Sequence, residues 1–63
     1  MPAAGHGREV IIEFTQIGNA VKVTAFDVDQ MVEVSIVGSP AAGEQSLKRT
    51  VLSKLDYVLA KGP

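Results

Sequence analysis

The side chains that could do chemistry are few, and their spacing favours no catalytic or metal-binding site. The single histidine, His6, stands between two glycines, where a lone imidazole is more often solvated than a ligand or a base. Asp27 and Asp29 flank Val28, but this pair falls well short of the roughly six to eight oxygen ligands that Ca²⁺ takes. The sequence therefore predicts a protein that is not an enzyme and uses neither a metal nor another cofactor.

Composition limits the partners. The chain has 63 residues, no cysteine and a formal net charge of −1. A single domain of this size buries only about 60% of its unfolded surface, and no disulfide can support it, so we expect a homodimer. The nearly balanced charge disfavours nucleic acid and anionic membranes as partners. No apolar run approaches the roughly 20 residues of a membrane helix, and the first residues do not resemble a signal peptide, so we expect a cytoplasmic protein.

The elements that must position any site begin with a β-hairpin. Residues 8–17 are rich in β-branched side chains, and alternate positions form an apolar face. Gly18 and Asn19 suit a primed two-residue turn, so Ile17 should pair with Ala20. This register puts Val10, Ile12 and Phe14 on the same face as Val21, Val23 and Ala25.

A second hairpin is predicted to follow at residues 27–30, where polar side chains surround Val28. Pairing Phe26 with Met31 puts Val34 beside Val23, on the apolar face that the first hairpin selects. The two registers agree on one face, which supports a three-stranded meander.

A C-terminal helix is predicted from Glu44, with an alternative start at Pro40. Gly38 to Gly43 are small or turn-forming residues that end the third strand. The helix presents an apolar stripe to the sheet, formed by Leu47, Val51, Leu55, Val58 and Leu59. The predicted fold class is α+β: a three-stranded antiparallel meander with one helix packed on one face (β-β-β-α), in two layers. Residues 1–7 are expected to be a disordered tail, and residues 8–61 a single domain.

The face of the sheet away from the helix is the predicted interaction surface. It carries Ile11, Phe26 and Met31 as one apolar patch, with Val37 on the third strand. The two outer strands also have free edges that could pair with a second chain. The sequence does not choose between the edge of the first strand, the edge of the third strand and a face-to-face contact.

Two other functions remain open. Lys22, Lys48, Arg49 and Lys54 could bind RNA, because three strands followed by a basic helix resemble the second half of a double-stranded-RNA-binding domain. An enzyme would need groups that only the fold brings together, such as Glu13 and Lys22 on the outer face. The sequence assigns no small-molecule ligand.

The order of short motifs along the chain carries a further resemblance. The motifs are Arg8-Glu-Val, Gly18-Asn-Ala-Val-Lys-Val, Glu33-Val-Ser-Ile-Val-Gly, Leu47-Lys-Arg and Lys54-Leu-Asp-Tyr-Val-Leu. In this order the chain resembles a family of small uncharacterised alphaproteobacterial proteins, a domain of unknown function. The resemblance implies a bacterial, cytoplasmic protein and no particular site residue.

Overall fold

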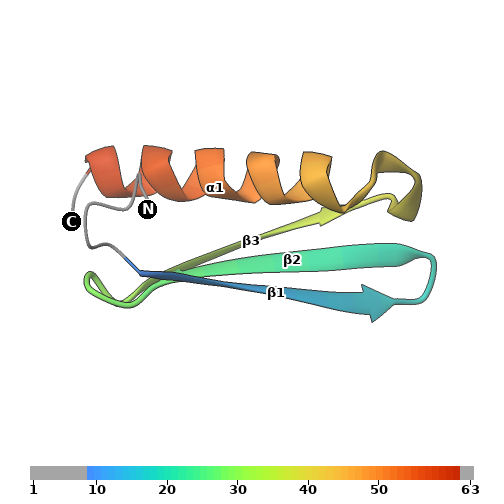
Figure 1. The fold of residues 1–63 in the computed structure, drawn as a ribbon, viewed down its shortest axis with the longest axis horizontal. Helices are drawn as coiled ribbons and strands as arrows, with labels where there is room; N and C mark the ends of the chain where they lie inside the picture. Colours follow the sequence, from blue (N-terminus) through green and yellow to red (C-terminus); the bar gives the residue numbers. More distant parts are fainter. Residues whose placement is uncertain (1–8, 62–63) are drawn as a thin grey trace.

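The computed structural model describes residues 9–61, which form three strands followed by a helix. The elements are β1 (Val10–Ile17), β2 (Ala20–Asp27), β3 (Val32–Gly38), a 3₁₀ turn η1 (Pro40–Ala42) and α1 (Glu44–Lys61). The strands form one antiparallel sheet in the order β1-β2-β3, and α1 lies on one face of it (Figure 1). The predicted β-β-β-α fold is confirmed; the expected tail at residues 1–7 lies outside the described residues.

The first hairpin has the predicted register. Ile17 pairs with Ala20 and Phe14 with Val23, so the turn consists of Gly18 and Asn19. Gly18 has a φ of 59°, a left-handed conformation in which glycine avoids the steric cost of a Cβ atom.

The predicted register of the second hairpin is wrong by two residues. Asp27, not Phe26, is the last residue paired before the turn, and its partner is Val32. The turn therefore comprises residues 28–31. Its geometry has a local cause: Asp27 Oδ1 accepts a hydrogen bond from the Gln30 amide at 2.9 Å, and Met31 takes a left-handed φ of 57°. A shift of two residues keeps every side chain on its predicted face, because strand side chains alternate with a period of two.

The helix begins at Glu44, the preferred of the two predicted starts. The alternative start at Pro40 forms a separate turn, in which Ser39 Oγ accepts a hydrogen bond from the Ala41 amide at 3.1 Å. Gly43 then separates this turn from α1 with a φ of 85°.

The core lies between α1 and two of the three strands. Its buried side chains are Val23, Ala25, Val34, Leu47, Val51 and Leu55. The helix packs against β3 and β2 and has no comparable packing against β1, which lies farthest from it in Figure 1. A helix is about 10 Å across with its side chains and strands are about 4.8 Å apart, so one helix covers two strands. The prediction that Phe14 is a core residue is therefore wrong: its side chain is 36% exposed.

Candidate functional site

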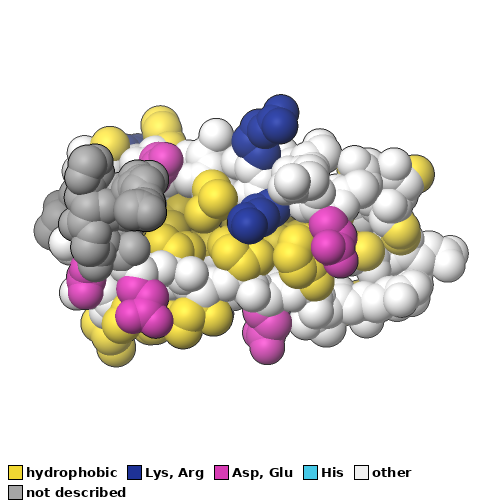
Figure 2. Space-filling model, viewed as in Figure 1, with side chains coloured by type: hydrophobic (Ala, Val, Ile, Leu, Met, Phe, Trp, Pro, Cys, Tyr) yellow, Lys and Arg dark blue, Asp and Glu magenta, His cyan; other side chains and the backbone are white. Residues whose placement is uncertain are grey.

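The helix-facing side of β1 is an apolar surface that α1 covers only in part. Ile12 and Phe14 share the inner face with the buried core because they pair with Ala25 and Val23. Figure 2 shows hydrophobic side chains along a band between α1 and β1.

Two leucines of α1 border the same surface. Successive helix residues are about 100° apart, so Leu52 and Leu59 project from one side of the buried stripe and Lys54 from the other. Lys54 reaches β3, which places the two leucines on the side of β1; both are only partly buried. We call the surface formed by Ile12, Phe14, Leu52 and Leu59 the open flank.

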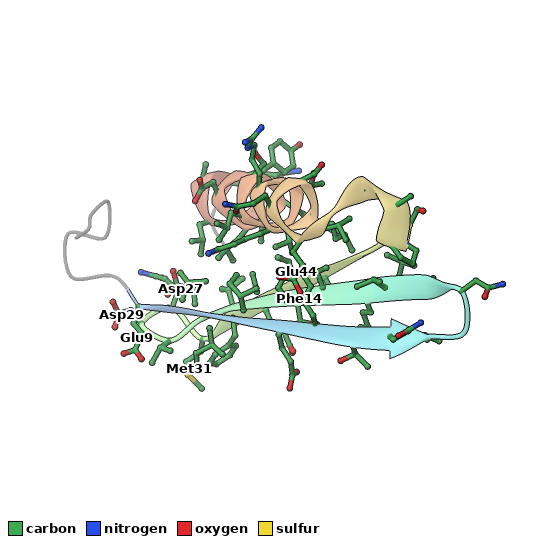
Figure 3. The ribbon with its side chains drawn as sticks, turned by 45° about the vertical axis from the view of Figure 1, so that its right-hand side comes forward. Glu9, Phe14, Asp27, Asp29, Met31 and Glu44 are labelled. Atoms are coloured by element: carbon green, nitrogen blue, oxygen red, sulfur yellow. The ribbon has the colours of Figure 1, made fainter. Side chains whose placement is uncertain are left out.

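A hollow of about 340 Å³ lies between β1, β2 and the start of α1. Its lining residues are Phe14, Gln16, Val21, Pro40, Gly43, Glu44 and Leu47. Phe14 projects from β1 toward the first turn of α1, near Glu44 (Figure 3). The floor of the hollow is apolar, and the carboxylate of Glu44 lies at its rim. This lining suits an apolar side chain of a partner better than it suits a reacting group.

The free edge of β1 adjoins the open flank. The Val28 amide donates to the Glu9 carbonyl oxygen at 3.1 Å. Hydrogen bonding alternates along an antiparallel strand, so the odd-numbered residues of β1 face β2. The N–H and C=O groups of Val10, Ile12, Phe14 and Gln16 therefore point away from the sheet, toward any strand that might be added.

The edge of β3 differs, because the helix covers part of it. Lys54 Nζ donates a hydrogen bond to the Ser35 carbonyl oxygen at 2.9 Å. This carbonyl group points outward, since the groups of β3 that bond to β2 belong to even-numbered residues. A lysine at an edge hinders the addition of another strand, so the two edges of the sheet are not equivalent.

The predicted outer patch is brought together only in part. Ile11 and Phe26 face each other as predicted, and Ile11 is 52% exposed. Met31 does not pair with Phe26: it lies in the turn, 73% exposed, on the side of the sheet away from α1 (Figure 3). Phe26 instead pairs with Glu33, and Val37 pairs with Lys22 in the other half of the sheet. A role for these residues in an interface stays a prediction.

The four basic residues considered for RNA binding do not share one surface. Lys48 and Arg49 line a shallow hollow of about 280 Å³ with Gln45 and Leu52. Lys54 bonds to β3, and Lys22 lies on the opposite face of the sheet, because it alternates with the buried Val23. RNA binding stays a prediction, carried by the helix residues and without help from Lys22.

Glu13 and Lys22, the pair considered for an enzyme, lie diagonally on the outer face. Their direct partners across the strands are Thr24 and Thr15 respectively. Among residues 9–61 no group of histidine, cysteine and acidic side chains is arranged to hold a metal ion.

The sequence analysis missed Leu52 and the bond made by Lys54. Leu52 falls one residue after Val51, outside the regular stripe, so only its position beside a partly covered strand gives it a role. The residues around Lys54 do not indicate its hydrogen bond, because the acceptor is a backbone carbonyl group 19 residues away.

No helix in residues 9–61 has the length and hydropathy of a membrane span.

Comparison with known proteins gives a family but no activity. No curated protein and no solved structure matches the chain. One family matches residues 7–62, which confirms the expectation of a domain of unknown function. The chain belongs to the family described as domain of unknown function (DUF6898).

Proposed function

We propose that this protein is a non-catalytic interaction domain that self-associates through the open flank and forms a homodimer. The observation that carries the proposal is that α1 packs against β2 and β3 and leaves the apolar inner face of β1 only partly covered. An exposed contiguous apolar surface on a small domain is characteristic of an interface.

Two further observations support a second copy of the chain as the partner. Among residues 9–61 only six apolar side chains are buried in the core, and a core this small gains stability from association. The open flank also contains a large aromatic side chain beside a hollow, which is the usual composition of an energetically dominant contact.

The test is the oligomeric state of the purified protein and of the variant Phe14→Glu. Sedimentation at tens of micromolar should give a dimer for the unaltered chain. The glutamate should raise the dimer dissociation constant roughly 30-fold or more, because losing a dominant contact costs about 2 kcal/mol or more. Phe14 is partly exposed, so the variant should retain its circular dichroism spectrum.

Thr15→Lys is the matched control, since Thr15 is the next residue of β1, is exposed and faces the opposite side of the sheet. It should sediment as the unaltered protein does. A monomeric unaltered protein would contradict the proposal. A dimer that Phe14→Glu leaves intact and that Thr15→Lys or Phe26→Ser dissociates would assign the interface to the outer face instead.

A further inference from the structure

We infer that the two copies join by antiparallel pairing of their β1 strands, with Ile12 of each copy on the two-fold axis, to form one six-stranded sheet with both helices on the same face. This inference rests on the proposed self-association and specifies its geometry. It concerns the backbone edge of β1, whereas the proposed function concerns the apolar side chains beside it.

The two edges of the sheet favour β1. On β3, the outward carbonyl group of Ser35 is already bonded to Lys54. On β1, the outward groups of Val10, Ile12, Phe14 and Gln16 are placed for pairing with a new strand. A partner that covered the open flank without pairing would partly dehydrate these backbone groups and leave them without hydrogen bonds, which is unfavourable.

The alternation of inward and outward backbone groups along β1 allows few pairing registers. Residues whose backbone groups point outward must pair with each other, so even-numbered residues face even-numbered residues across the axis. Placing Ile12 opposite Ile12 also places Val10 of each copy opposite Phe14 of the other. The resulting three pairs are all apolar and lie on the inner face. On the outer face this register puts Glu13 beside Ile11.

The neighbouring registers are less favourable. A shift in one direction puts Glu13 directly opposite its own copy, and a shift in the other puts Glu9 opposite Glu13; like charges in such pairs repel each other. A second step in the first direction puts Phe14 opposite Phe14 but places Ile12 beside the polar Gln16. The register centred on Ile12 is the one that keeps the apolar residues of β1 together and the carboxylates apart.

In this arrangement the open flanks of the two copies are adjacent. Ile12 and Phe14 of one copy stand beside the same residues of the other on neighbouring strands, about 4.8 Å apart. Leu52 and Leu59 border this shared apolar strip on both sides, because the two α1 helices lie over the outer strands of the dimer.

The experiment uses single cysteines, which the natural chain lacks. Ile12→Cys, Glu13→Cys and Phe14→Cys are each oxidised at a concentration where the unaltered protein is dimeric, and disulfide-linked dimer is measured on a non-reducing gel. Directly paired residues have Cα atoms about 4.5–5.5 Å apart, within reach of a disulfide, whereas Cα atoms more than about 7 Å apart cannot be bridged. Ile12→Cys should become mostly cross-linked, and the other two variants should remain mostly uncross-linked.

A mixture of Val10→Cys and Phe14→Cys chains provides an independent check. These two positions face each other across the axis, so the mixture should cross-link while each variant alone should not. This second pair keeps the test decisive if Ile12→Cys weakens the dimer, which sedimentation of the reduced variant measures.

The outcomes separate the inference from the function it rests on. Cross-linking of Glu13→Cys or Phe14→Cys in place of Ile12→Cys would overturn the register. A dimer by sedimentation in which no β1 cysteine cross-links would overturn strand pairing and leave self-association through the open flank standing. A monomer would overturn both.

Discussion

Gly38 ends β3 directly beneath the helix, at a place with no room for a side chain. A Cβ atom at this position would lie 2.5 Å from Leu47 Cδ2, well inside van der Waals contact. Leu47 is a buried core residue, so the close approach of strand and helix depends on the missing side chain. The sequence analysis assigned Gly38 only to the break after the third strand; the structure adds this packing role.

Gly38→Ala should lower the free energy of unfolding by about 1–3 kcal/mol, the usual cost of overpacking a core. Chemical denaturation monitored by circular dichroism measures the change. The same substitution should cost less in a Leu47→Val background, because the shorter side chain no longer occupies the contested space and the two positions are coupled. Equal costs in both backgrounds would show that Leu47 is not the obstacle.

At the scale of elements, α1 makes different contacts at the two edges of the sheet. Its buried stripe covers β2 and β3, and Lys54 extends over the edge of β3 to the Ser35 carbonyl group. On its other side, Leu52 and Leu59 face β1 without closing over it. One edge is therefore hindered by a charged side chain, and the other adjoins an apolar surface.

Lys54→Met should promote association beyond the dimer. Methionine keeps the apolar stem of the side chain but neither donates a hydrogen bond to Ser35 nor carries a charge, and an unhindered strand edge invites further strand pairing. Light scattering over a concentration series should show species larger than for the unaltered protein.

Arg49→Met is the control for Lys54→Met, because it removes one positive charge from an exposed position of α1 that lies opposite the buried stripe, away from the edge of β3. Its scattering should match that of the unaltered protein. Identical scattering by both methionine variants would mean that the bond to Ser35 does not hinder the edge of β3.

At the scale of the whole molecule, stability and assembly should be linked. The buried core is small, and the open flank adds apolar area that a monomer leaves in water. A dimer that buries this area is stabilised by mass action, so its unfolding depends on protein concentration.

The thermal midpoint should rise by roughly 10 °C over a hundredfold increase in concentration, because mass action then favours the folded dimer and a domain this small shifts by several degrees per kcal/mol. Calorimetry or circular dichroism at the two ends of the range measures it. For Phe14→Glu the midpoint should not depend on concentration. A constant midpoint for the unaltered chain would indicate that the domain folds and unfolds alone.

The sequence by itself determined the elements, their order and the face each side chain occupies. Alternating apolar residues, the Gly18-Asn19 turn and the apolar stripe of α1 are local patterns, and local patterns can be read without coordinates. Even where the register of the second hairpin was wrong, the faces were right, because an error of two residues preserves the alternation of a strand.

Only the tertiary structure decided the register at Asp27, the exposure of Phe14 and the different state of the two edges. The first depends on a hydrogen bond between Asp27 and the Gln30 amide. The second depends on which two strands the single helix covers, a choice that the apolar pattern leaves open because all three strands present the same kind of face. The third depends on Lys54 meeting a carbonyl group far away in the chain. The second and third join groups whose proximity is created by folding, so no local pattern records them. The first is a bond within one turn, and the several turn-forming residues at 27–30 left the position of that turn open.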